Sequence, residues 1–414
     1  MTEEIKQKIK AINNGHVPCG YKRTSIGVVP TEWEEKTLRQ VGKFSKGKGL
    51  PGTEMKSEGI PCVGYGDIYT KYNYKFEKTI NYVDKEIADE SVPIENGTLL
   101  FTCSGETAEE IGKCVCYNGE DTIYAGGDIA LLNIKNDILP LFVGYQQNIP
   151  SSIKQKARYG QGHSVVHIYG ESLGKLGVVY PKNKSEQVRV VDILIKWDEM
   201  VQLQDKLIES LILQKKALIQ KLLTPSKEWK RVRVGELTKE ISIRNKDNVC
   251  KNIKSVSNKL GFINQDEQFS KQVASQDTSN YKKVNYGNIV YNPSRINVGS
   301  IAIYKENEVG IVSPMYVVFK CKEINPDLLV LLLSTDRGQY DIKTYLTGSV
   351  RDSLSYSDLA KIEIFLPNAI TQKKIVDLFA TVDNMIELQK KKMEKLKLQQ
   401  MSMQQLLLAG IVRV

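Results

Sequence analysis

The chain carries one long segment twice, 185 residues apart. Residues 187–223 align without a gap onto residues 372–408, and 15 of the 37 aligned positions are identical. One copy lies in mid-chain and the other at the C-terminal end, so each follows a long stretch of different character. Repetition at a fixed period is typical of a duplicated structural unit. The sequence therefore predicts one domain and one helix, followed by a second domain and a second helix.

The repeated segment predicts a helix with a coiled-coil seam. Neither copy contains Gly or Pro, and both are rich in Leu, Lys, Gln and Glu, which lose little rotamer freedom in a helix. Apolar residues recur at alternating steps of four and three, as in coiled coils. The residues that we assign to the seam, with its Gln interruptions, are Trp197, Met200, Gln204, Leu207, Leu211, Gln214, Met385, Gln389, Leu396, Gln399 and Met403. The simpler alternative is a surface helix that packs only on its own domain.

The two stretches that precede the helices are also related to each other. Trp33 and Trp229 lie near their starts, and residues 140–181 align without a gap onto residues 326–367. Strands are predicted at 98–102, 176–180, 288–292 and 362–366, and Asn325-Pro326 predicts a capped helix start. Short strands, one or two helices and many polar loops predict an α+β fold, with two mixed, strand-rich domains separated by two long helices.

Composition limits the possible environments and partners. No apolar run approaches the length of a membrane span, and seven cysteines in 414 residues fit reduced thiols in a cytosol better than a disulfide framework. The net charge is +10; the first stretch, 20–185, is neutral, whereas the second, 225–370, carries +5. This charge permits a polyanionic partner but falls short of the dense basic patch of a non-specific nucleic-acid binder.

Motifs for catalysis are missing. The three histidines form no recognisable nucleophile pattern, and Cys114-x-Cys116 lacks two further zinc ligands at finger-like spacing, so core thiols are expected. Asn292-Pro293 lacks the second Pro and the aromatic residue of an adenine methyltransferase motif, and no cofactor loop follows a strand. We expect that the chain alone neither methylates nor cleaves DNA. A scaffold protein that binds protein partners and a stand-alone methyltransferase or nuclease are the competing hypotheses.

Three further motifs complete the pattern: the opening Tyr21-Lys-x-Thr24-x-Ile26-Gly27-x-x-Pro30-x-x-Trp33, the domain ending Gly348-Ser349…Leu359…Ile362…Pro367, and the helix starts at Gln187 and Gln372. Taken in order, these motifs resemble the specificity subunit of a type I restriction–modification system over essentially the whole chain. The resemblance implies two target-recognition domains that each read half of a split, asymmetric DNA site. It also implies two helices that pack antiparallel, set the spacing of the domains and dock the methyltransferase subunits.

The resemblance supplies boundaries, partners and cofactors as expectations. The partners are double-stranded DNA, two modification subunits and the restriction subunits, in a prokaryotic cytoplasm and without a membrane. No cofactor is expected on this chain; S-adenosylmethionine belongs to the modification subunit, and ATP with magnesium to the restriction subunit. The expected parts are an N-terminal helical segment (1–19), the first recognition domain (20–185), the central helix (186–224), the second recognition domain (225–370) and the C-terminal helix (371–414).

Polar loops at equivalent places in the two domains are the expected DNA contacts. Arg, Lys, Asn, Gln, Ser and Thr side chains read base edges, while phosphate contacts fix the register on the duplex. In the first domain we select Lys46, Lys48, Ser104, Arg158, Tyr159, Gln161, His163 and Ser164. In the second domain we select Arg244, Lys246, Asn292, Ser294, Arg295, Asn297, Ser349 and Arg351. For any single one of these, a solvated loop side chain without a ligand is the alternative.

The Gln interruptions predict the register of the antiparallel helices. A buried amide that faces another amide is satisfied, whereas one that faces Leu is left unpaired at a cost. The expected register pairs Gln204 with Gln399, Gln214 with Gln389, Met200 with Met403 and Leu207 with Leu396. A parallel arrangement, with Gln204 opposite Gln389, is the alternative.

Overall fold

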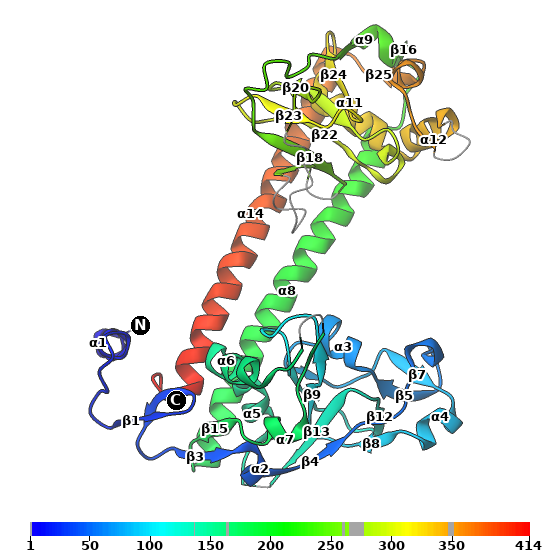
Figure 1. Ribbon diagram of the computed structural model, residues 1–414. Helices are drawn as coiled ribbons and strands as arrows, with labels where there is room; N and C mark the ends of the chain where they lie inside the picture. The colour runs from blue at the N-terminus through cyan, green and yellow to red at the C-terminus, as the bar shows by residue number, and fades with distance from the viewer. Residues whose placement is uncertain (1, 136, 163–164, 259–260, 265–276, 347–351) are drawn as a thin grey trace. The chain divides into compact units, whose positions relative to one another are not determined.

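The computed structural model describes residues 2–135, 137–162, 165–258, 261–264, 277–346 and 352–414. The chain forms two compact units (Figure 1). The first unit combines residues 1–204 with residues 392–414, and the second unit consists of residues 205–391. The C-terminal end of the chain therefore folds together with its N-terminal part.

The two repeat copies form the two longest helices, α8 (Lys184–Leu222) and α14 (Ala369–Leu408). Both begin within three residues of the sequence-predicted helix starts and, as the repeat predicts, continue unbroken for about forty residues. None of the helices in the described part of the chain is long and apolar enough to span a membrane.

The first unit is built on two main sheets. The larger has the strand order β4-β13-β9-β11-β6, and the smaller has the order β7-β5-β12-β8. Their bounds are β4 Gly42–Lys46, β5 Ile60–Val63, β6 Lys75–Phe76, β7 Asn81–Val83, β8 Val92–Ile94, β9 Thr98–Thr102, β11 Cys114–Tyr117, β12 Ile123–Ala125 and β13 Ile129–Ile134. Three small pairs complete the unit: β1 (Tyr21–Thr24) with β2 (Gly27–Pro30), β3 (Glu34–Thr37) with β15 (Gly177–Tyr180), and β10 (Ser104–Gly105) with β14 (Val166–His167).

The second unit repeats the strand orders of the two main sheets, except that β6 has no counterpart among the described residues. Its sheets have the orders β17-β24-β21-β22 and β19-β18-β23-β20, and β16 pairs with β25 as β3 does with β15. The β7-β5-β12-β8 sheet contains one parallel pair, β5 with β12, and the β19-β18-β23-β20 sheet contains the equivalent pair, β18 with β23. In each sheet antiparallel partners flank this pair. The bounds are β16 Lys230–Arg233, β17 Thr238–Ile241, β18 Ile253–Ser257, β19 Gly261–Asn264, β20 Lys282–Val284, β21 Ile289–Tyr291, β22 Ile301–Ile303, β23 Gly310–Val312, β24 Val317–Cys321 and β25 Glu363–Leu366.

Shorter helices flank the sheets in equivalent places. The first unit has α1 Glu3–Asn13, α2 Leu38–Val41, α3 Tyr65–Thr70, α4 Lys85–Asp89, α5 Pro140–Gln146, α6 Pro150–Tyr159 and α7 Gly170–Leu173. The second has α9 Val234–Leu237, α11 Pro326–Ser334, α12 Asp336–Tyr345 and α13 Tyr356–Leu359. The predicted cap of α11 is confirmed, because the Asn325 side chain accepts hydrogen bonds from the amides of Asp327 and Leu328.

The central strands are buried on both faces, which explains their nearly continuous apolar sequences. In β9, Leu99 and Phe101 face a core that includes the ends of α8 and α14, whereas Leu100 faces the core toward the smaller sheet. Cys114 and Cys116 on β11 likewise lie in the first of these cores. The thiols are packed as small hydrophobic groups, and burial raises the pKa of Cys116 to about 12.

The buried stripe of the long helices differs from the sequence assignment at five of its eleven positions. Six assigned residues are buried or half-buried, namely Trp197, Gln204, Leu211, Gln389, Leu396 and Met403. Five are exposed, namely Met200, Leu207, Gln214, Met385 and Gln399. In each of the five cases the next residue takes the inward place: Val201, Ile208, Lys215, Ile386 and Gln400. The seam is corrected accordingly; where both neighbours are apolar, hydrophobicity alone could not choose between them.

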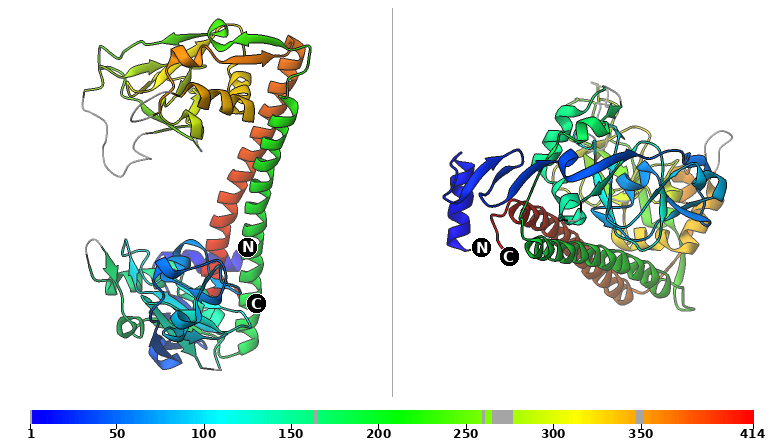
Figure 2. Two further views of the ribbon diagram at one scale, coloured as in Figure 1. Left: turned by 90° about the vertical axis from the view of Figure 1, so that its right-hand side faces the viewer. Right: turned by 90° about the horizontal axis from the view of Figure 1, so that it is seen from below.

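The helices run antiparallel within each unit (Figure 2), in a register other than the expected one. In the first unit the Gln400 amide donates to the Asp198 carboxylate, and in the second Lys215 forms an ion pair with Asp383. These contacts are equivalent, because Asp383 repeats Asp198 and Gln400 repeats Lys215 at the 185-residue offset. The expected register, which would place Asp198 opposite a residue five positions further along α14, is wrong.

Asp198 is the centre of a polar network that holds the end of α14 in the first unit. The Tyr145 hydroxyl on α5 and the Gln400 amide both donate to its carboxylate. The Gln404 amide donates to the Tyr145 carbonyl at 3.1 Å and its oxygen accepts from the Tyr74 hydroxyl at 3.0 Å. Despite these donors, burial raises the pKa of Asp198 to about 6.

This network predicts a pH-dependent contribution to the stability of the first unit. Because the folded-state pKa of Asp198 lies above 3.8, the contribution is greatest below pH 4 and decreases as the pH rises through 6. We expect the free energy of unfolding of the wild type, relative to Asp198→Asn, to fall by about 2 kcal/mol from pH 4.5 to pH 7.5. Urea denaturation at the two pH values measures this difference. An identical pH dependence in both proteins would contradict it.

Candidate nucleic-acid interface

Lys46 and Lys48 lie at the end of β4 in the first unit. Both side chains are exposed, and among the described residues neither forms an ion pair. Gly47 between them must be glycine, because a Cβ there would lie 2.0 Å from the carbonyl oxygen of Gly126. The close approach of the two backbones fixes where the neighbouring lysines leave the sheet, with their charges available to an anionic partner.

Ser104 and Gln161 converge on one short ribbon. Ser104 on β10 lies opposite His167 on β14, and the backbone of His167 also exchanges two hydrogen bonds with Gln161, at 2.8 and 2.9 Å. The Ser104 hydroxyl lies 3.0 Å from His167 Nδ1. Residues separated by about sixty positions in the sequence are thus brought together at the same edge of the unit.

Arg158 and Tyr159 are exposed at the C-terminal end of α6. This helix is anchored by Lys156, which is 1% exposed and donates to the Gly112 carbonyl at 2.6 Å. Burial lowers the pKa of Lys156 to about 8. The anchor links α6 to the loop that follows β10. The next two candidates, His163 and Ser164, lie outside the described residues.

The β4 strand and the end of β14 border a cleft of about 740 Å³ in the first unit, whereas α6 does not line it. Lys46 and His167 line it, together with Arg39, Lys43, Cys103 and Tyr169 and the acidic side chains of Asp128 and Glu171. Basic, acidic and aromatic groups therefore share one concave surface. Such a mixture can offer both donors and acceptors to the edges of bases.

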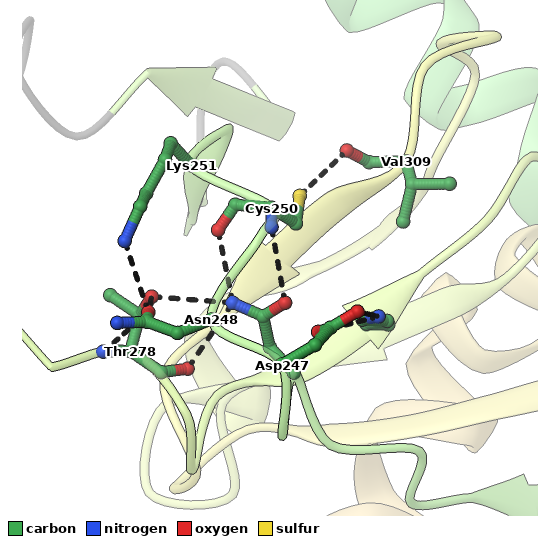
Figure 3. A network of polar contacts seen from close by, with 8 residues as sticks. Asp247, Asn248, Cys250, Lys251, Thr278 and Val309 are labelled. Atoms are coloured by element: carbon green, nitrogen blue, oxygen red, sulfur yellow. Dashed lines mark hydrogen bonds and ion pairs between the residues drawn. The ribbon is translucent and has the colours of Figure 1, made fainter.

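In the second unit, Arg244 and Lys246 lie on the loop that follows β17, and both are exposed. The loop is organised around Asn245, whose side chain bonds both the amide and the carbonyl of Cys250, at 3.2 and 3.0 Å. Figure 3 shows the surrounding network, in which Asn248 accepts from the Thr278 hydroxyl at 2.6 Å and from Lys251 at 3.1 Å. A buried amide therefore holds a loop that presents cations outward.

The remaining candidates of the second unit follow β21. Asn292 is 9% exposed, and its side-chain oxygen accepts from the amide of Ser294, so it shapes the turn. Ser294 and Arg295 are exposed and Asn297 is half-buried. Arg295 forms no ion pair within the part of the chain that the structure describes. Ser349 and Arg351 lie outside the described residues.

The backbone shows that the two loop sets are equivalent. Ile168 donates its amide to the Cys103 carbonyl in the first unit, and Leu354 donates to the Pro293 carbonyl in the second, at 2.9 and 3.1 Å. Both donors are completely buried. Ser104 therefore corresponds to Ser294, because each follows the carbonyl that receives this bond.

Four of the residues that complete the first cleft lie outside the sequence-predicted set of DNA contacts. His167, Tyr169, Lys43 and Arg39 all line it, but only Lys46 among the selected residues does so. His167 was considered only as a possible catalytic group. Its place at the end of the closing loop, two residues before another aromatic residue, was the available signal. Among the residues that the structure describes, no group of three or more His, Cys, Asp or Glu side chains could hold a metal ion.

Comparison with known families gives a match to both halves of the chain. The family model described as the type I restriction modification DNA specificity domain matches residues 30–212 and again residues 226–398. A putative type I restriction enzyme MjaX specificity subunit from Methanocaldococcus jannaschii is 25% identical, over 95% of this chain and 97% of that protein. The type I restriction enzyme MjaVIII specificity subunit of the same organism is 23% identical, over 93% and 94%.

Solved structures show a similar fold. The S subunit of a type I restriction–modification system from M. genitalium superposes with a TM-score of 0.51 at 15% identity, covering 91% of this chain and 96% of that one. A chain from a study of complex assembly and conformational transition in the type I R-M system gives a TM-score of 0.60 at 13% identity, covering 93% and 99%.

The exposed lysine at the end of β4 gives a first test of the interface. If Lys48 contacts a DNA phosphate, Lys48→Ala should reduce the slope of log K against log salt concentration by about 1, at similar cost for every sequence. Binding of the full chain to duplex DNA over a salt series measures this slope. Lys10→Ala on α1 is the matched control, because Lys10 is also an exposed lysine of the first unit. Equal slopes for both variants would count against the contact.

Proposed function

The chain belongs to the type I restriction–modification DNA specificity family, and from this we propose that each unit reads one half of a bipartite DNA site. The two half-sites would differ in sequence, so that the complete site is asymmetric. Two specificity domains along one chain are what a split target requires.

One observation carries the proposal. The frame of each unit, meaning its two main sheets and the helices packed on them, is duplicated, whereas the loops are not. The same sheets recur in the same order, and Ser104 and Ser294 occupy equivalent places. Around them, however, the first unit offers Lys46 and a histidine-lined cleft, and the second offers Arg244 and Arg295 on differently built loops. Because the two units present different hydrogen-bond donors at equivalent places, they favour different bases in the two half-sites.

The chemistry would belong to partner subunits. S-adenosylmethionine on a modification subunit, and ATP with magnesium on a restriction subunit, remain our proposal for the complete complex. Methyl transfer by the purified chain, free of partners, would contradict this division. The role of the helices in setting the spacing between half-sites also remains a prediction.

Arg295 tests whether the half-sites are read independently. Its guanidinium is exposed and forms no ion pair among the described residues, so it can bind the O6 and N7 acceptors of a guanine. Arg295→Ala should cost about 1–3 kcal/mol of discrimination at one position of the second half-site and none in the first. Methylome sequencing of a host that carries the intact system shows both halves at once. Equal loss in both halves would rule out independent reading.

The long helices carry an equivalent exposed apolar pair in each unit. Met200 and Leu203 on α8 are 41% and 65% exposed, and their repeat equivalents Met385 and Leu388 on α14 are 46% and 65% exposed. All four lie outside the buried stripe. Large apolar side chains that recur on the surface mark protein interaction sites. We assign each pair to one modification subunit, which gives two copies in the complex.

A negative charge introduced into the apolar pair of one helix should therefore remove one partner copy. Leu203→Glu and Leu388→Glu should each reduce the modification subunits per chain from two to one, and the double variant should lose both, since a buried unpaired carboxylate is costly. Native mass spectrometry of the co-expressed complex counts the copies. Gln202→Glu is the matched control, because it adds the same charge at the neighbouring exposed position. Full occupancy in the double variant would refute the assignment.

A further inference from the structure

His167 occupies an unusual place at the cleft of the first unit. Its backbone is held on both sides, opposite Ser104 in the β10–β14 ribbon and opposite Gln161 in an isolated bridge. Its ring is held as well, because Nδ1 lies 3.0 Å from the Ser104 hydroxyl. The direction of the imidazole is therefore fixed before any ligand arrives.

The second ring nitrogen has no such partner. Among the described residues, Nε2 of His167 makes no hydrogen bond, although the residue is half-buried and lines the cleft. The ring lies nearly parallel to that of Tyr169, with centroids 6.3 Å apart and an angle of 13°. Tyr169 is 56% exposed, so this aromatic pair reaches from the cleft to the surface.

The charges around the cleft favour a base edge over a phosphate. Arg39, Lys43 and Lys46 line part of the wall, but Asp128 and Glu171 line it too, and these carboxylates would repel a phosphate. Carboxylates instead accept from the amino groups of bases. The exposed cations Lys48 and Arg158 do not line this cleft and remain available for the backbone.

From these contacts we infer that His167, oriented by Ser104, reads one base pair of the first half-site through Nε2. The inference rests on the proposed function and adds a specificity-determining pair to it. In neutral imidazole one nitrogen donates and the other accepts, so the hydroxyl at Nδ1 determines the role of Nε2. When Ser104 accepts from Nδ1, Nε2 is an acceptor for an adenine or cytosine amino group; when Ser104 donates, Nε2 donates to guanine.

The second unit lacks this imidazole. The equivalent bonds of Ile168 and Leu354 place Ser353 where the first unit has His167. The His167–Ser104 pair therefore acts on one half-site only, and recognition of the other half-site serves as an internal control.

His167→Asn tests the inference, because an Asn amide can keep the bond to Ser104 while it removes the group at Nε2. We expect discrimination at one base pair of the first half-site to fall about tenfold, with the second half unchanged. Ser104→Ala should relax the same base pair, since the imidazole then loses its fixed role. His167→Gln, whose amide reaches the Nε2 position, should retain a preference there. His16→Asn, at an exposed histidine of the same unit, is the matched control.

Methylome sequencing of hosts carrying each variant in the intact system gives the readout. An unchanged motif in both His167→Asn and Ser104→Ala, or changes at two different base pairs, would overturn the inference while the proposed function stands. Absence of a bipartite motif in the wild type would instead refute the proposed function. If a variant abolishes methylation, the affinity of its assembled complex is measured on duplexes substituted at each base pair. A profile parallel to that of the wild type would then overturn the inference.

Discussion

Asp198 joins three parts of the first unit that are far apart in the sequence. Its carboxylate receives the Tyr145 hydroxyl of α5 and the Gln400 amide of α14, and it belongs itself to α8. In the same unit, Arg413 pairs with Glu186 at 2.7 Å, and the Tyr21 hydroxyl donates to the Gly410 carbonyl at 3.1 Å. The recognition loops of this unit depend on a core that includes Leu407 and Leu408. An interaction between helices is therefore also a condition for the shape of a DNA-reading surface.

In the duplicated frame, the residues that stabilise the fold are different from the residues that are expected to determine specificity. Buried positions are repeated across the units. The inward positions of α8 and α14 match at the 185-residue offset, and the two main sheets keep the same strand order apart from β6, which only the first unit has among the described residues. The loops that end the strands follow no such repeat. Asn245 organises one of them through its amide, and Lys156 anchors a helix beside another through its ammonium group. Each unit can thus change its surface contacts without disturbing the packing that both units share.

Helices and strands that extend over many residues were predictable from the sequence pattern. The orientation of a single side chain, which depends on its tertiary contacts, was not. The repeat predicted the two helices, and the β-propensity of residues 98–102 predicted β9 with its observed bounds. The seam was misplaced at Met200, Leu207 and Met385, because an apolar neighbour follows each one and only tertiary packing chooses between them. His167 escaped notice for a related reason. The proposed role of His167 depends on its contact with Ser104, more than sixty residues away in the sequence. That contact results from the pairing of β10 with β14, which no local sequence pattern predicts.

The discontinuous first unit has a consequence for synthesis of the chain. Residues 205–391 are one continuous segment and can fold as they leave the ribosome, whereas residues 1–204 lack residues 392–414 until these have been synthesised. At ordinary rates of about 5–20 residues per second, synthesis of the 210 residues from 205 to 414 imposes a delay of roughly 10–40 s. During this time Leu194 and Val190 have no α14 to cover them. The second unit would mature before the first, in the reverse of their order along the chain, and loss of residues 392–414 would damage the unit to which residues 1–204 belong.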